Sequence, residues 1–233
     1  DSLEYTFQLE EGVKFHNGEV MTADDVVYSF EQYIANPAKN NFVSMIDKVE
    51  MVDANTVKVT LNKVTPLFLV YINELPILNK KFVEEHNGNI SDVACGTGPY
   101  KLTSIDLATS AMLERNDDYR LAPAAIEKVE LRYVGDRSTA SVQLETGDLD
   151  IMSIDPSQLV SFENNDKFTV EKVQTLKTAL LAINTTVAPL DNKLVRQAMT
   201  YAVDKKSIIT IAYENCAVPA RLQANDTNCF GVD

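Results

Sequence analysis

Apolar and polar positions alternate near the start of the chain and then take on a helical period. Tyr5–Leu9 carries apolar side chains two residues apart, which is the period of a half-buried strand. Val13–Phe15, bounded by Gly12 and an Asn-Gly pair, predicts a short second strand. Thr22–Asp25 has an N-cap hydroxyl with an acid three residues later, so we expect a helix to begin there and to end at Asn36-Pro37.

The same two periods predict elements along the rest of the chain. Strands are expected at 49–52, 57–61, 100–104, 111–115, 126–134, 150–153, 168–173 and 179–183. Helices are expected at 66–73, 80–85, 138–144, in a short segment starting at Pro156, after a cap at Asp191, and at 205–213. Because strands and helices interleave throughout, the pattern favours an α/β fold.

Composition and charge narrow the class of protein. The chain has 233 residues, of which 45% are hydrophobic, enough for one large domain or two smaller ones. The formal net charge of −13 repels phosphate backbones, so we expect no nucleic-acid partner. No run of eighteen apolar residues occurs, and no membrane-spanning helix is predicted. The strand-like sequence begins almost at Asp1, which we interpret as an interior or trimmed segment.

The cysteines and histidines give little support for a metal site. The three cysteines form no Cys-x-x-Cys pair, and His16 and His86 are the two histidines. In an oxidising compartment Cys216 and Cys229 could form a disulfide, which would leave Cys95 buried or paired elsewhere; the sequence leaves this open. We therefore expect no metal and no cofactor.

Motifs for catalysis are missing from the sequence. It contains no nucleophile elbow, no His-Glu-x-x-His and no phosphate-binding loop. Gly96-Thr97-Gly98-Pro99 lacks the third glycine and the strand–helix context of a dinucleotide fingerprint. His16, in a turn after Phe15, is interpreted as a surface or packing residue. The protein is therefore expected not to be an enzyme.

Five segments together resemble the family 5 extracellular solute-binding proteins, the oligopeptide-, dipeptide- and nickel-binding group served by ABC importers. These segments are residues 5–18 continuing through 21–30, 96–100, 114–119, 136–140 running on to 147–151, and 184–185 with 188–191, 195–198 and 202–205. Each segment is short, but their order and spacing extend over nearly the whole chain. The sequence departs from the pattern at Arg120, where an aromatic residue is usual, at Cys95, and in its lack of tryptophan.

The resemblance implies a bilobal fold like that of periplasmic binding proteins, type II, cluster C. Members of the family are about twice as long, so it implies that this chain is a fragment. By resemblance, residues 1–93 form the satellite domain of the first lobe, residues 94–175 part of the main first lobe, and residues 176–233 the incomplete start of the second lobe.

The resemblance also implies a function, namely capture of oligopeptides or dipeptides by closure of the two lobes and delivery to an ABC importer permease. It implies an extracytoplasmic monomer, attached to a membrane only through a lipid anchor outside this chain. Two alternatives stay open. One is a binder of a nickel chelate, haem or another small solute within the same family, and the other is a structural or interaction fragment that binds nothing.

Four residues are candidates for ligand binding. Ser153 and Asp155 follow the strand predicted at 150–153, and α/β sheets place ligands at strand ends. Arg115 has the fork that favours bidentate contact with a ligand carboxylate. Asn184 ends a strand predicted in the second lobe. For each residue the competing interpretation is a turn or a hydrogen bond within its own lobe.

Overall fold

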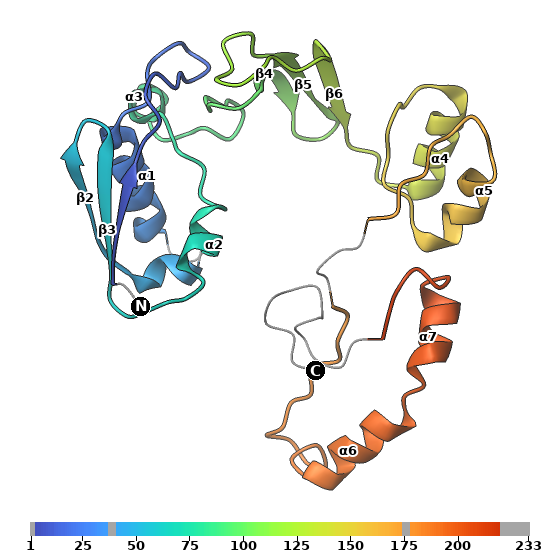
Figure 1. Ribbon diagram of the computed structural model, residues 1–233. Helices are drawn as coiled ribbons and strands as arrows, with labels where there is room; N and C mark the ends of the chain where they lie inside the picture. The colour runs from blue at the N-terminus through green and yellow to red at the C-terminus, as the bar shows by residue number, and fades with distance from the viewer. Residues whose placement is uncertain (1–2, 37–40, 174–177, 220–233) are drawn as a thin grey trace. The chain divides into compact units, whose positions relative to one another are not determined.

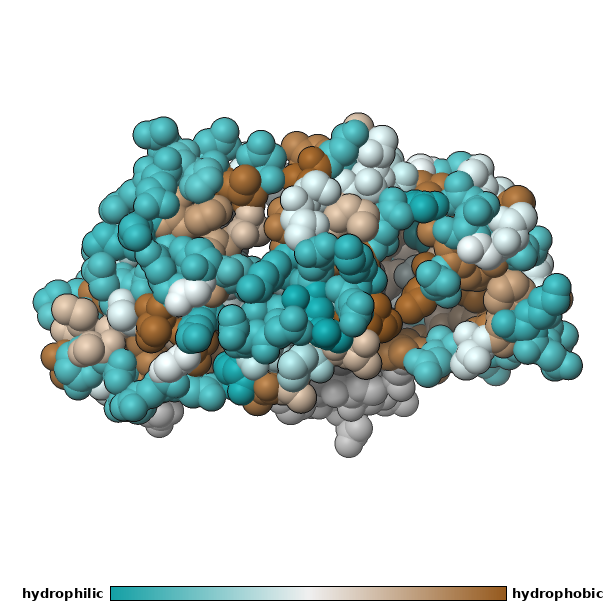
Figure 2. Space-filling model, turned by 90° about the horizontal axis from the view of Figure 1, so that it is seen from above, coloured by the Kyte–Doolittle hydropathy of each residue, from teal (hydrophilic) through white to brown (hydrophobic). Residues whose placement is uncertain are grey.

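The computed structural model describes residues 3–36, 41–173 and 178–219. The chain divides into two compact units, Asp1–Gly135 and Asp136–Asp233, which are described separately (Figure 1). Hydrophilic residues predominate on the face shown in Figure 2, in keeping with the net charge of −13. The predicted boundary between residues 93 and 94 stays a prediction, and the one between 175 and 176 lies outside the described residues.

The first unit begins with a three-stranded antiparallel sheet. Its strands are β1 (Glu4–Gln8), β2 (Ile46–Asp53) and β3 (Thr56–Leu61), in the order β1-β3-β2. Tyr5 and Val49 both lie opposite Val59 in the register, so the apolar positions of all three strands share one face. This confirms the strands predicted from alternation at 5–9, 49–52 and 57–61.

Helix α1 (Ala23–Ala35) covers that apolar face and starts where its cap was predicted. The Asp25 Oδ2 atom accepts hydrogen bonds from the Thr22 N–H (2.9 Å) and the Thr22 hydroxyl (3.0 Å). The Asp25 Oδ1 atom accepts from the N–H of Lys80 (3.0 Å), the first residue of α3 (Lys80–Glu85). One buried carboxylate therefore fixes the starts of two helices.

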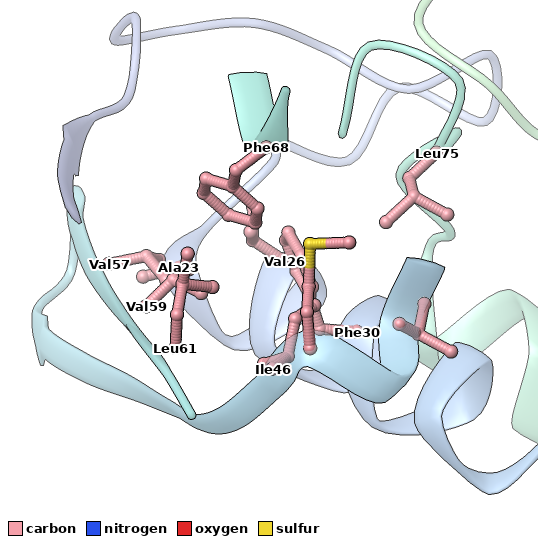
Figure 3. Close-up of a cluster of buried hydrophobic side chains, with 11 residues drawn as sticks. Ala23, Val26, Phe30, Ile46, Val57, Val59, Leu61, Phe68 and Leu75 are labelled. Carbon is pink, nitrogen blue, oxygen red and sulfur yellow. The ribbon is translucent and has the colours of Figure 1, made fainter. Parts of the chain in front are cut away.

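The core of the first unit lies between this sheet, α1 and α2 (Phe68–Ile72) (Figure 3). Phe68 is fully buried, and its ring centroid lies 4.7 Å from that of Tyr5. The buried cluster contains Ala23, Val26, Phe30, Val43, Met45, Ile46, Val57, Val59, Leu61, Phe68 and Leu75. Three of these residues come from β3, which makes the central strand the most buried one.

A second antiparallel sheet completes the first unit. It consists of β4 (Tyr100–Asp106), β5 (Ser110–Arg115) and β6 (Lys128–Arg132), in that order, and confirms the strands predicted there. Asn116 directly follows β5 and is almost fully buried. Its N–H donates to the Pro99 carbonyl (2.9 Å) and its side-chain amide to the Gly98 carbonyl (3.0 Å). Asn116 thus holds the loop that leads into β4.

The described part of the second unit is helical. It contains α4 (Arg137–Thr146), a single 3₁₀ turn η2 (Pro156–Gln158), α5 (Leu159–Glu163), α6 (Lys193–Ala202) and α7 (Lys205–Ala212). These helices confirm the predictions at 138–144, after Pro156, and at 205–213. Among the described residues of the whole chain, no helix is both long and apolar enough to cross a membrane.

Several predicted elements are wrong. The segments 150–153, 168–173 and 179–183 form no strand, although each carries apolar residues in a short run or in partial alternation. Alternation identifies an apolar face, but a strand also needs a neighbour for its backbone hydrogen bonds, and the described residues of the second unit supply none. Val13–Phe15 contributes only an isolated bridge between Lys14 and Val20.

The N-cap of α6 differs from the prediction by one residue. The Asn192 side chain, and not Asp191, accepts the hydrogen bond from the Leu194 N–H (2.9 Å). Both residue types are good caps, so the sequence alone could not choose between these neighbours. The predicted pairing of Cys216 with Cys229 lies outside the described residues, because Cys229 belongs to the segment 220–233.

Candidate functional site

The candidate site is built on the turn that follows α4. Asp136 caps this helix by accepting from the Thr139 N–H (2.7 Å) and the Thr139 hydroxyl (2.9 Å), and these bonds, the backbone one first, lower the pKa of the Asp136 carboxyl. At the other end Gly147 has φ +84°, a left-handed conformation that glycine adopts without strain. The Asp148 N–H then donates back to the Gln143 carbonyl (2.8 Å), so the chain reverses direction.

This reversal brings the segment after α4 to the first residue of the same helix. The Nη1 atom of Arg137 donates to the Ser153 carbonyl (2.9 Å), and its Nε atom lies 3.2 Å from an Asp155 carboxylate oxygen. About half of each charged side chain is exposed, 54% for Arg137 and 52% for Asp155. Two of the predicted ligand residues, Ser153 and Asp155, are therefore joined by one arginine.

Gln158 closes the loop from the other side. Its side-chain oxygen accepts from the Asp155 N–H (3.2 Å), while its amide nitrogen donates to the Ser141 hydroxyl (2.7 Å) and the Arg137 carbonyl (3.3 Å). Asp155 and Gln158 form a capping box at the start of η2. The loop is therefore held at both ends by hydrogen bonds to α4.

A small apolar cluster anchors this loop. Leu159 and Phe162 of α5 and Ala140 of α4 are buried. The Phe162 ring makes an edge-to-face contact with Phe168, with centroids 5.1 Å apart. These contacts fix α5, and with it the position of the loop 149–158.

Arg115, the third predicted ligand residue, is engaged within the first unit. Its Nε atom donates to Asp117 (2.7 Å), its Nη1 atom to the Ala124 carbonyl (3.3 Å), and its Nη2 atom lies 3.6 Å from Glu127. Asp117 is the first cause of the raised pKa of Arg115. A ligand carboxylate would have to replace Asp117 to obtain the bidentate contact that was predicted.

Asn184, the fourth predicted residue, forms a local turn. Its side-chain oxygen accepts from the Thr186 N–H (3.0 Å) and the Thr186 hydroxyl (2.7 Å). It belongs to the second unit, as do Ser153 and Asp155, whereas Arg115 belongs to the first. The structure thus links Ser153 and Asp155 through Arg137, and it gives Asn184 and Arg115 partners of their own.

Sequence reasoning missed Arg137 and Gln158. Both had a readable signal, because Asp155-Pro-Ser-Gln158 has the spacing of a capping box and Arg137 follows the Asp136 cap. The contact between Arg137 and Ser153 spans sixteen residues and depends on the reversal at Gly147. Such a contact cannot be derived from local patterns.

The chemistry that these groups offer is recognition of polar groups. The cluster combines a half-exposed guanidinium, a carboxylate and two amide or hydroxyl groups, which can pair with ligand carboxylates, ammonium groups and amides. Among residues 3–36, 41–173 and 178–219, no group of three or more histidine, cysteine or acidic side chains is placed to hold a metal ion.

Comparison with known proteins gives a match over most of the chain. Residues 1–222 match the family model described as bacterial extracellular solute-binding proteins, family 5. A glutathione-binding protein of Pectobacterium atrosepticum is 31% identical over 94% of this chain and 44% of its own length. The chain therefore spans less than half the length of this relative.

Two solved structures share the fold. NikZ of Campylobacter jejuni, in complex with Ni(L-His), superposes with a TM-score of 0.80 at 30% identity, over 91% of this chain and 44% of its own. The ABC transporter-associated periplasmic binding protein DppA of Helicobacter pylori, in complex with the peptide STSA, has a TM-score of 0.75 at 28% identity, over 91% and 47%.

Proposed function

Because this chain belongs to the bacterial extracellular solute-binding proteins of family 5, we propose that it is part of the solute-binding component of an ABC importer. In this proposal the whole protein works outside the cytoplasm, captures oligopeptides or dipeptides by closure of two lobes, and delivers them to the permease. The observation that carries the proposal is the family match over residues 1–222. The family is one of binding proteins, so the proposed role is transport and not catalysis.

Peptides are the preferred ligand class because one relative is named for a peptide ligand and another was solved in complex with one. Glutathione is a tripeptide, and the Helicobacter protein was solved with the peptide STSA. A peptide carries a carboxylate, an ammonium group and repeated amides. Recognition through these shared groups provides affinity that does not depend on the ligand's side chains.

Within the chain, we assign the loop 149–158 to the ligand side of the second unit. Ser153 and Asp155 present polar groups there, and Arg137 acts as a positioning residue that holds both. The exposed half of the Arg137 guanidinium can also donate to a ligand carboxylate. Asn184 and Arg115 remain proposed contacts that a ligand would reach only by competing with Thr186 and Asp117.

A nickel chelate is the second candidate ligand, favoured by the match to NikZ with Ni(L-His). In that complex the metal arrives with an amino acid, so the protein needs few metal ligands of its own. This chain has two histidines, which fits recognition of a chelate better than capture of a bare ion.

The test is thermal unfolding of the whole natural protein with a panel of di- and tripeptides and with nickel–histidine. A ligand present at 100 times its dissociation constant stabilises the native state by about 2.7 kcal/mol. Stabilisation by peptides, but not by a matched mixture of their free amino acids, supports the proposal. Stabilisation by nickel–histidine alone selects the second candidate, and no stabilisation by any member of the panel contradicts both.

A further inference from the structure

His16 connects two segments of the first unit that lie eighty residues apart in the sequence. Its backbone N–H donates to the Gly96 carbonyl (2.8 Å), and the Gly96 N–H donates to the ring atom Nδ1 (3.2 Å). The other ring nitrogen, Nε2, lies 3.1 Å from the Gly98 carbonyl oxygen. Both edges of the imidazole are therefore used by the loop that leads into β4.

These contacts fix the protonation state of the ring. A backbone N–H can only donate, so Nδ1 of His16 must carry a lone pair toward Gly96. A carbonyl oxygen can only accept, so Nε2 must carry the proton toward Gly98. The geometry is satisfied by the neutral Nε2–H tautomer, and an imidazolium would place two donors face to face at Nδ1.

The contacts join the two sheets of the first unit. His16 lies downstream of β1, in the turn enclosed by the bridge between Lys14 and Val20, and Gly96–Pro99 runs directly into β4. An ion pair between Arg120 and Glu10 (2.7 Å) also connects these parts of the first unit, and its side chains are 41% and 57% exposed. Exposed ion pairs of this kind contribute little to stability. The half-buried His16 ring is therefore the stronger of these two connections.

The surroundings of His16 also disfavour a positive charge. The pKa of His16 is lowered, and burial of the ring is the first cause. The hydrogen bond to the Gly98 carbonyl raises this pKa, whereas the charge of Lys101 in β4 lowers it further. The Cys95 thiol beside it has a raised pKa, with burial as the first cause, and stays neutral. Glu19, in the same turn, has its pKa lowered first by its hydrogen bond to Lys81. The groups that shift the pKa of His16 are its burial, the Gly98 carbonyl and Lys101, and no carboxylate is among them.

We propose that His16 is a pH-sensitive latch whose protonation at Nδ1 releases the loop Gly96–Pro99 from the turn after β1 and loosens the connection between the two sheets. This inference goes beyond ligand capture, because it concerns a conformational device within the first unit. It needs no ligand and no second lobe.

The sign of the pH dependence follows from the direction of the shift. The folded-state pKa of His16 lies below the ordinary value of 6.5, so the native state binds fewer protons than the unfolded chain in the window between the two values. The stabilisation from the latch is complete above 6.5 and is lost as the pH falls below that value and through the folded pKa. Acidification therefore opens the latch.

The test is amide hydrogen exchange at Gly96, corrected for intrinsic rates, at about pH 7.5 and about pH 5. Loss of one hydrogen bond lowers the protection factor of an amide about fivefold, so we expect the protection factor of Gly96 in the unmodified protein to be about fivefold smaller at the lower pH. His16→Phe, which keeps a ring but offers no acceptor to the Gly96 N–H, should show low protection at both values. The matched control His86→Gln removes the other histidine, whose ring bonds the Phe82 carbonyl within α3, and should keep the pH effect.

A second measurement uses the unmodified protein and so does not depend on whether a variant folds. Two-dimensional ¹⁵N NMR of the imidazole rings should show His16 as the Nε2–H tautomer near pH 7.5 and give a pKa below the ordinary value of 6.5. A His16 pKa above this value, protection at Gly96 that does not change with pH, or loss of the pH effect in His86→Gln would each overturn the proposal.

Discussion

The two units of the chain use their apolar residues in opposite ways. In the first unit eleven buried residues form one cluster between a sheet and two helices (Figure 3). In the second unit the buried apolar residues among those described are Ala140, Leu159 and Phe162. Helix α6 buries none of its residues, and Tyr201 on that helix is 90% exposed.

This difference shows what an amphipathic pattern does and does not specify. Helix α6 has a clear apolar stripe, with Leu194 71% exposed, and α7 carries Ile211 at 78%. A stripe of this kind gains free energy only when a partner covers it. The first unit has its own core, whereas the described part of the second unit has little buried apolar surface to stabilise it. We therefore expect core substitutions in the two units to change the free energy of unfolding by different amounts.

The largest expected effect is the loss of the Phe68 ring from the core of the first unit. Phe68→Ala should reduce the free energy of unfolding by about 3–5 kcal/mol, because Phe68 is fully buried beside Tyr5. The matched change Leu194→Ala in α6 should cost less than about 0.5 kcal/mol. Urea unfolding checks both, and equal costs would contradict the comparison.

The next largest loss of stability is expected when the buried Phe162 ring of the second unit is truncated. Phe162→Ala removes the contact with Phe168 and should cost roughly 2–4 kcal/mol of local stability. Hydrogen exchange should show faster exchange in α4 and α5 and unchanged rates in β3. Loss of protection in β3 would mean that the first unit does not hold its own core.

Gly147→Ala tests the reversal that forms the candidate site. A left-handed conformation disfavours any side chain, so we expect a loss of about 1–2 kcal/mol at φ +84°. Gly98→Ala is the matched control in the first unit, because an added methyl group would meet nothing within 4 Å there and its φ lies outside the left-handed region. Thermal unfolding compares the two, and a larger loss for Gly98→Ala would argue against this account.

Arg137→Lys should have the smallest effect on the free energy of unfolding and should weaken ligand binding at the candidate site. The Arg137–Asp155 pair is half exposed, so we expect less than about 1 kcal/mol of change in unfolding free energy. A lysine cannot reproduce two directed donors, and ligand affinity of the whole protein should fall about tenfold. Arg115→Lys is the matched change in the first unit. Calorimetric titration with a peptide ligand measures both, and an unchanged affinity for Arg137→Lys would remove its positioning role.

Much of the first unit was predictable because its signals are local. The cap at Thr22 and Asp25 placed the start of α1, and strict alternation placed β1 and β3. The predicted strands at 168–173 and 179–183 failed because a short alternating or apolar segment carries no information about the neighbour that a strand needs. The α6 cap was displaced by one residue because Asp191 and Asn192 are equally good candidates.

The candidate site was predictable only in part. Ser153 and Asp155 were found as polar residues after an expected strand end, although that segment is a loop. Arg137 was missed because its contacts depend on the reversal at Gly147. His16 was interpreted as a surface or packing residue, and its half-buried ring does pack against Gly96. A methyl group added to Gly96 would lie 3.7 Å from the Cε1 atom of that ring.

The most direct test of the proposed function is native mass spectrometry of the whole natural protein, purified from cells without refolding, beside this 233-residue chain. The account predicts a spread of adducts at peptide masses on the whole protein and none on the chain alone, which spans under half of its relatives. A whole protein that is bare, and stays bare after exposure to peptides and to nickel–histidine, would contradict the assignment as a solute-binding component.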